Sequence, residues 1–213
     1  MNTFRSLAAA LLTVLPAALY AQTAESTPAS PYVFNEFVKS TVLQRNGAKV
    51  SASLNYNTIT EEMMFEQNGS RIVMDKGETD TIYLQNRRFI PAKDVYMEKL
   101  TNTPAALYVQ HKNKAVAAAK GEKANEVLSD IYKKKSVEKV DPYALTLPGS
   151  FRLLNDSKYW LQRGKDFISL SNLKKIPSLF PGKEAEITKF IAENKISPAS
   201  EEDMIKLVKF CNQ

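Results

Sequence analysis

Residues 44–75 of the chain, QRNGAKVSASLNYNTITEEMMFEQNGSRIVMD, contain the pattern that decides the fold. Their middle part alternates apolar and polar residues, and the apolar set is Ala48, Val50, Ala52, Leu54 and Tyr56. Successive side chains of a β-strand point to opposite faces. The alternation therefore predicts a strand with one face in the core and the other in solvent.

Two Asn-Gly pairs in this stretch predict tight turns. Asn46-Gly47 precedes the alternating strand, and Asn68-Gly69 separates EMMFEQ from SRIVMD. Both residue types tolerate the positive φ angles of a hairpin turn, and Asn-Gly between apolar runs is the strongest local hairpin signal. We therefore expect antiparallel hairpins here.

Similar short strands fill the chain up to about residue 112 and resume later. The segments with strand character are Phe37–Gln44, Ala48–Asn55, Glu62–Gln67, Ser70–Asp75, Thr79–Gln85, Arg88–Ile90, Val95–Leu100, Ala106–Lys112, Lys158–Gln162 and Phe167–Leu170. Short connections favour antiparallel neighbours, because a parallel crossover needs about a dozen residues or more. The prediction is an antiparallel β-meander, arranged as a sandwich or a partly open barrel. Arg163–Asp166 is predicted to be a four-residue hairpin loop, and Trp160 is expected inside or at the seam with the tail.

The C-terminal part of the chain is predicted to be an αα-hairpin. Its apolar residues recur at helical spacing and comprise Ile187, Phe190, Ile191, Met204, Leu207, Val208 and Cys211. Ser200 and Asp203 approximate a capping box at the start of the second helix. Two such helices are too small to be stable alone, so we expect them to pack on the β part. The predicted fold class is α+β.

The N-terminal segment has the pattern of a secretory signal peptide. Arg5 is followed by the apolar run Leu7–Leu15 and by small residues up to Ala21. This run is shorter than the roughly 20 residues that span a bilayer, which favours a cleaved signal over an anchor. We expect cleavage after Ala21, a periplasmic or secreted mature chain and no transmembrane segment.

The predicted organisation follows from these patterns. It comprises a signal peptide (1–21), a flexible leader (22–31), a β-rich body (32–112), a lysine-rich excursion (113–140), further strands with a hairpin (141–170) and a helical tail (171–213).

The excursion carries most of the excess positive charge. Residues 112–139 hold eight lysines and four acidic residues, a local charge of +4 in a chain of formal net charge +6. Helical character is predicted for Ala115–Ala119 and Ala124–Lys135. Lys133, Lys134 and Lys135 form a candidate polyanion-binding site. The intervening acids also fit an ordinary solvated surface, and the scarcity of aromatic residues disfavours nucleic acid as the ligand.

Few residues point to catalysis. The only histidine, His111, alternates with Leu107 and Val109 and is interpreted as a strand residue without a catalytic role. Glu61 and Glu62 are adjacent, so on a strand they would point to opposite faces and would not flank one scissile bond. Paired cysteines, HExxH and a Gly-rich phosphate loop do not occur in the sequence. We therefore assign no catalytic residue, no metal site and no cofactor.

The only cysteine, Cys211, lies on the apolar stripe of the last helix. A chain with one cysteine has no internal disulfide and must be held together by its core. Free cysteine is among the most buried residue types, so Cys211 is interpreted as a packing residue, with a reactive or intermolecular thiol as the alternative.

Three stretches carry a resemblance to known proteins. LNYNTITEEMMF, RRFIPA and the closing SLFPGKEAEITKFIAENKISPASEEDMIKLVKFCN together resemble a group of exported Bacteroidota proteins of unknown function. The shared features are an Asn-Tyr-Asn strand end and a Leu-Phe-Pro motif before a two-helix tail. The resemblance implies a β-rich envelope or secreted protein and transfers no catalytic residues. Asp80-Thr81-Ile82 also resembles the three-residue O-glycosylation signal of such bacteria.

The sequence thus favours a non-enzymatic exported module that binds or scaffolds an envelope protein or glycan. One alternative is the binding of an anionic polymer (glycan, lipid head group or nucleic acid) through Lys112–Lys139. Another is a hydrolase whose two carboxylates come from distant strands and are not visible as a sequence motif.

Overall fold

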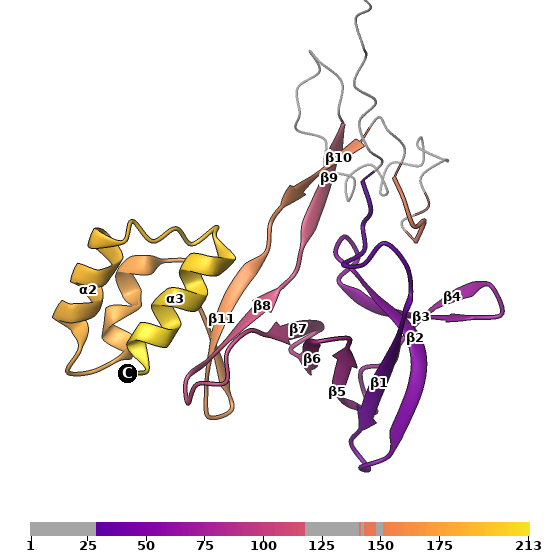
Figure 1. Cartoon of the computed structure of the whole chain (residues 1–213), viewed down its shortest axis with the longest axis horizontal. Helices are drawn as coiled ribbons and strands as arrows, with labels where there is room; N and C mark the ends of the chain where they lie inside the picture. The colour runs from indigo at the N-terminus through magenta and orange to yellow at the C-terminus, as the bar shows by residue number, and fades with distance from the viewer. Residues whose placement is uncertain (1–28, 118–140, 142, 148–150) are drawn as a thin grey trace, which may run out of the picture.

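The computed structural model of the chain describes residues 29–117, 141, 143–147 and 151–213. Within these residues, ten strands form one antiparallel sheet, two form a ribbon, and helices end the chain (Figure 1). The strands are β1 (Val38–Gln44), β2 (Lys49–Asn57), β3 (Glu62–Gln67), β4 (Ser70–Val73), β5 (Thr79–Leu84), β6 (Arg87–Ala92), β7 (Val95–Lys99), β8 (Ala106–Gln110), β9 (Asn113–Ala117), β10 (Phe151–Asn155), β11 (Lys158–Arg163) and β12 (Asp166–Ser169). The helical segments are the 3₁₀ turns η1 (Leu173–Lys175) and η2 (Pro177–Leu179) and the α-helices α2 (Glu184–Glu193) and α3 (Glu201–Cys211). The predicted α+β class is confirmed.

The main sheet is a single open layer with the strand order β12-β11-β8-β7-β6-β5-β1-β2-β3-β4. Strands β1 to β4 form a meander, after which β5 returns to the free edge of β1. Strands β5 to β8 form a second meander, and β11 adds to the free edge of β8. Within the part of the chain that the structure describes, β12 and β4 are the two edges, so the sheet is open.

Strands β9 and β10 extend β8 and β11 into a long two-stranded arm (Figure 1). The register of the β8–β11 pair continues into β9–β10, and the Asp156 N–H donates to the Lys112 carbonyl between them at 2.8 Å. The helix predicted at Ala115–Ala119 is wrong for its described part, because Ala115–Ala117 lies in β9. Here the ladder with β10 outweighs the high helix propensity of alanine. Ala124–Lys135 lies outside the described residues.

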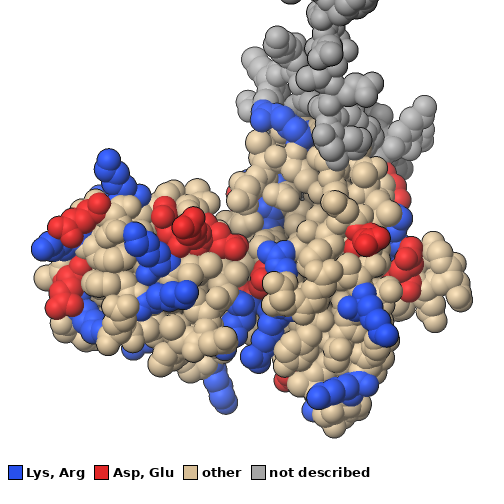
Figure 2. Space-filling model, in the orientation of Figure 1, with Lys and Arg blue, Asp and Glu red and all other residues tan. Residues whose placement is uncertain are grey.

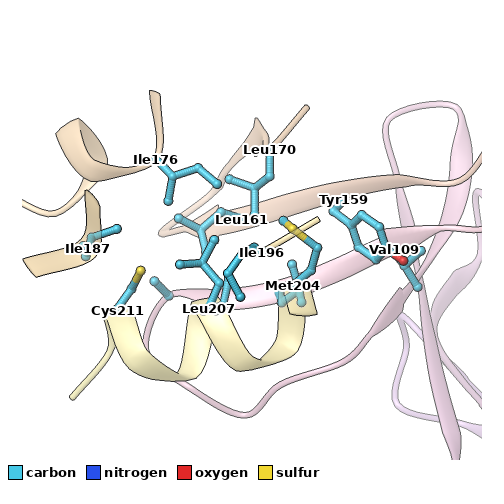
Figure 3. Close-up of a cluster of buried hydrophobic side chains, with 13 residues drawn as sticks. Val109, Tyr159, Leu161, Leu170, Ile176, Ile187, Ile196, Met204, Leu207 and Cys211 are labelled. Carbon is cyan, nitrogen blue, oxygen red and sulfur yellow. The ribbon is translucent and has the colours of Figure 1, made fainter. Parts of the chain in front are cut away.

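One face of the sheet carries two apolar clusters. The first lies on β1, β2, β3, β5, β6 and β7 and contains Val42, Leu54, Tyr56, Met63, Ile82, Leu84, Phe89 and Tyr96. The second, shown in Figure 3, joins β8 and β11 to the helical tail and includes Leu107, Leu161, Met204, Leu207 and Cys211. The predicted docking of the two helices on the β part is confirmed, since these side chains are at most 3% exposed.

The opposite face of the sheet holds Trp160. Its ring packs near Tyr108 and Phe167, and the Lys93 ammonium lies 3.6 Å from its centroid. The neighbouring residues Tyr159 and Leu161 face the helices instead. Trp160 is therefore half-buried away from the tail, and the alternative of a position at the seam is wrong.

The strand with alternating apolar and polar residues, β2, follows its predicted pattern only in its second half. Leu54 and Tyr56 are fully buried, whereas Val50 is 46% exposed because its end of the sheet extends beyond the core. Asn55, on the face predicted to be in solvent, is also fully buried. The difference arises because residues 32–36 cover that face, and their position is not encoded in the alternation.

The asparagines of the Asn-Tyr-Asn motif anchor neighbouring backbone. The Asn55 amide donates to the carbonyls of Phe34 and Glu36 at 2.8 and 2.9 Å, and its oxygen accepts from the Phe34 N–H. Asn57 accepts from the N–H of Ile59 at 2.9 Å and so orders the loop after β2. The two asparagines thus supply hydrogen-bond partners for backbone N–H and C=O groups that are shielded from water, and such buried groups are almost always paired in folded proteins.

The hairpin turns follow their sequence signals with two differences. At Asn46-Gly47 only Gly47 has a positive φ, 85°, so this turn lacks the pair of positive angles that was predicted. Asn68 and Gly69 have φ angles of 51° and 75°, as a primed turn requires. In the β11–β12 hairpin, Arg163 pairs directly with Asp166, so the loop has two residues and the predicted four-residue loop is wrong.

One of the two hydrogen bonds of the capping box predicted for α3 is present. The Ser200 hydroxyl accepts from the Asp203 N–H at 3.2 Å. The Asp203 carboxylate, however, accepts from the N–H of Ser197 at 3.0 Å and not from that of Ser200. The carboxylate therefore fixes the connection between the helices as well as the helix start.

No helix among the described residues is long and apolar enough to cross a membrane.

Cys211 points into the cluster beneath the helices (Figure 3) and is expected to be unreactive in the folded chain. Burial raises the pKa of its thiol from 9.0 to about 11, against the smaller opposing effects of Lys183 and a backbone hydrogen bond. Because the thiolate is the reactive form, a disulfide reagent at neutral pH should modify the thiol only after unfolding in urea. Equally fast modification of the folded and unfolded chains would show that the thiol is accessible.

The raised pKa of Cys211 also predicts how the stability of the fold changes at alkaline pH. Burial also raises the pKa of Tyr159 from 10.0 to about 12. In the unfolded chain both groups lose their protons at lower pH than in the folded chain. The free energy of unfolding should therefore fall as the pH rises from about 9 to about 12, which urea titrations across that range measure.

Candidate functional site

The lysine stretch enters the described structure only at its start. Lys112 is paired with Glu61, and Lys114 lies 3.0 Å from the Asp156 carboxylate. Both lysines therefore neutralise acids of the protein itself. Lys133, Lys134 and Lys135 lie outside the described residues.

His111 lies directly after β8 in a buried charged cluster with Glu98 and Arg87. Its Nε2 is 2.6 Å from one oxygen of Glu98, and the Arg87 Nε is 2.9 Å from the other. The histidine ring also lies beside Tyr56 and Phe89, with centroid distances of 6.4 and 6.1 Å. Glu98 is 6% exposed, so this cluster is held inside the protein.

The cluster lies between the two apolar clusters. Across the strands, Glu98 pairs with Phe89 of the first cluster and with Val109 of the second. Directly paired residues share a face of the sheet, so Glu98 is a carboxylate in the middle of an apolar surface. Arg87 and His111 engage both of its oxygens, which is the arrangement of a structural ion pair. The interpretation of His111 as a strand residue is wrong by one position, because β8 ends at Gln110. No local sequence pattern indicates Glu98 as its partner.

The adjacent acids Glu61 and Glu62 have separate partners. Glu61 is the last residue of the turn between β2 and β3 and has a φ of 61°, and its carboxylate binds Gln110 and Lys112. Glu62 accepts from the Tyr143 hydroxyl at 3.3 Å. Each therefore joins different segments of the chain, and the two do not face one another as a catalytic pair would.

A polar groove on the other face of the sheet is the strongest candidate for a functional site. It crosses β5, β6, β7, β8 and β11 next to the end of β1. Its lining residues are Arg45, Thr79, Asp80, Thr81, Arg88, Ile90, Pro91, Lys99, Tyr108 and Gln162. We call this site the sheet groove. Figure 2 shows basic side chains gathered where the helical part meets the β body.

Three cations of the sheet groove have no partner among the described residues. The side chains of Arg45, Arg88 and Lys99 make no ion pair or hydrogen bond there, in contrast to the paired Arg87 and Lys112. Asp80 is the one acid among the described residues that line the groove. The formal charge of these four side chains is +2, which suits an anionic ligand.

The pairing register of the strands places cationic and aromatic side chains next to one another in and beside the sheet groove. Tyr83 on β5 pairs with Arg88 on β6, and Lys99 on β7 pairs with Tyr108 on β8. Cationic and aromatic side chains therefore follow one another across the sheet. Burial raises the pKa of Tyr108 above its ordinary value, while the charge of Arg88 acts in the opposite direction. The Tyr108 hydroxyl is thus a neutral hydrogen-bonding group beside a guanidinium.

The Asp80-Thr81-Ile82 motif lies in β5 at the base of the groove. Thr81 is 2% exposed, and its hydroxyl donates to the Asp80 carboxylate at 2.7 Å. In the folded chain this hydroxyl is therefore not presented to a modifying enzyme.

Sequence reasoning did not identify the sheet groove. Its cations lie far apart in the sequence, at positions 45, 88 and 99, and of these only Arg88 has a neighbour of the same charge, Arg87. The one available signal was strand alternation, which places Arg88 and Ile90 on the face opposite to Phe89.

Comparisons with protein-family models, with curated proteins and with solved structures gave no match for this chain.

Proposed function

We propose that the chain is a non-enzymatic exported module that binds a cell-envelope partner through its β body. The observation that supports this most strongly is the sheet groove, where the side chains of Arg88 and Lys99 on strands and of Arg45 just after β1 form no ion pair or hydrogen bond with any described residue. Rigid strands position binding groups better than loops do. The pattern of the N-terminal segment supports export, and the resemblance to exported Bacteroidota proteins agrees with it.

The buried charged cluster supports a structural role for the residues that most resemble catalytic groups. His111 and Glu98 are engaged with each other and with Arg87 beneath the sheet surface. The sheet groove, by contrast, is open and lined mainly by cationic, hydroxyl and amide groups that can bind a ligand. This contrast favours recognition over turnover.

The proposal is tested with the full chain expressed in a bacterial host and recovered from the periplasm, its N-terminus being read by mass spectrometry. The expected N-terminal residue is Gln22. The immobilised protein should retain material from solubilised bacterial envelope fractions. The double variant Arg88→Glu/Lys99→Glu should lose this retention by about tenfold or more, because placing like charges opposite an anionic partner costs several kcal/mol.

Lys174→Glu/Lys175→Glu is the matched control. Both lysines are exposed on η1, outside the sheet groove, and the change in net charge is the same. The control should retain envelope material as the unchanged chain does. Equal loss in both double variants would mean that net charge alone governs retention, and the proposed role of the groove would then be wrong.

A further inference from the structure

We infer that the sheet groove takes an acidic carbohydrate chain, with sugar carboxylates at its cations and a sugar ring on Tyr83. This inference rests on the proposed function and specifies the chemistry of its ligand. It places the anion site in the sheet groove, on residues in or next to six neighbouring strands, whereas the sequence suggested the lysine stretch.

The shape of the groove suits an extended ligand. Its lining runs from Arg45, which directly follows β1, to Gln162 on β11, across the intervening strands β5, β6, β7 and β8. Neighbouring strands lie about 4.8 Å apart, so a path across six strands covers up to roughly 24 Å. Small-molecule sites are enclosed and mostly apolar, whereas this groove is open and polar. A linear chain of several sugar residues fits such a path.

The charges favour a carboxylated sugar over a phosphate-dense polymer. Arg45, Arg88 and Lys99 supply cations, and guanidinium groups match carboxylates in bidentate geometry. Asp80 contributes a carboxylate whose second oxygen makes no hydrogen bond with any described residue. That oxygen can accept from a sugar hydroxyl, whereas it would repel a closely spaced row of phosphates. The Gln162 amide and the Tyr108 hydroxyl add neutral hydrogen-bonding groups of the kind that hydroxyls need.

Tyr83 is not a lining residue of the groove but lies beside one, Arg88, and supplies a surface for the sugar ring. It is 41% exposed, and it pairs across the strands with Arg88 on the same face of the sheet. An aromatic ring is a large and rigid apolar surface at low entropic cost. The C–H face of a pyranose can pack on it while the ring substituents reach Arg88. An acidic sugar carries a carboxylate next to a flat apolar ring face, and these two groups match Arg88 and Tyr83.

The test measures binding of short galacturonic acid oligomers to the full exported chain by titration calorimetry at low salt. Carboxyl-reduced oligomers of the same length, inorganic polyphosphate and duplex DNA are the comparison probes. The acidic oligomer should bind at least tenfold more tightly than the reduced oligomer and polyphosphate. Arg88→Gln should weaken its binding by about tenfold, and Tyr83→Ala by a similar factor, while Tyr83→Phe keeps it.

The result also separates the two proposals. If the acidic oligomer releases the envelope material from the immobilised chain, both proposals hold. If the envelope material is retained in a groove-dependent way but the oligomer neither binds nor releases it, the carbohydrate inference is wrong and the proposed function stands. Tighter binding of polyphosphate or DNA, or unchanged oligomer binding by Arg88→Gln, would likewise overturn the inference. Lys174→Gln is the control for the loss of one charge.

Discussion

Replacing Leu207 by alanine is expected to lower the free energy of unfolding by about 2–5 kcal/mol. Leu207 is fully buried on α3 and belongs to the cluster that joins the helices to β8 and β11. Truncation removes apolar contacts and leaves a cavity, because the sheet and the helices cannot both close over it. The measurement is urea unfolding followed by the fluorescence of Trp160, the only tryptophan.

Leu154→Ala is the matched control for this substitution. Leu154 is 38% exposed on β10, so the same chemical change should alter the free energy of unfolding by about 0.5 kcal/mol or less. The helical signal in circular dichroism should be lost at the same urea concentration as the fluorescence signal if the tail and the sheet unfold as one unit. A cost for Leu207→Ala no larger than that for Leu154→Ala would contradict docking of the tail.

Replacing Glu98 by glutamine is expected to cost about 3 kcal/mol, at the lower end of the range for breaking a buried ion pair. The carboxylate side chain is 7% exposed and holds Arg87 and His111, whose side chains are 27% and 14% exposed. A neutral amide leaves the guanidinium partly buried without its counter-charge. The partial exposure of Arg87 is the reason for expecting the lower value. The measurement is again the urea midpoint at neutral pH.

The exposed pair Lys189–Glu193 provides the control. Its atoms are 3.8 Å apart and its side chains are 73% and 62% exposed, so Glu193→Gln should cost about 0.5 kcal/mol or less. Because the chain has one histidine, its imidazole gives one set of nuclear magnetic resonance signals. These should shift in Glu98→Gln and not in Glu193→Gln. Equal stability of the two variants would mean that the cluster contributes no more than a surface pair.

Together these variants separate two roles within one sheet. Leu207 and Glu98 act on the face that holds the core, whereas Arg88 and Tyr83 lie on the face that carries the sheet groove. We expect the first pair to change stability and the second pair to change binding with little loss of stability. This division follows from the period of two in a strand, which assigns neighbouring residues to different environments.

Several parts of the fold could be predicted from local sequence alone. The Asn68-Gly69 turn, the Ser200 cap and the spacing of Met204 and Leu207 all appear in the structure as the sequence indicates. Each depends on residues close together in the chain, whose backbone preferences and side-chain spacing act without the rest of the protein. The alternation in β2 predicted burial correctly at Leu54 and Tyr56, which the core covers, and failed at Val50, which is 46% exposed.

The sequence by itself therefore determined the antiparallel character of the body, its main turns and the amphipathic helices of the tail. Only the tertiary structure decided that Glu98 is buried between Arg87 and His111, and that cations far apart in the sequence share one groove. These outcomes depend on β5 returning to β1 and on β11 adding to β8. The physical reason is that strand order and register bring together residues far apart in sequence, and no local pattern encodes which distant strands will pair.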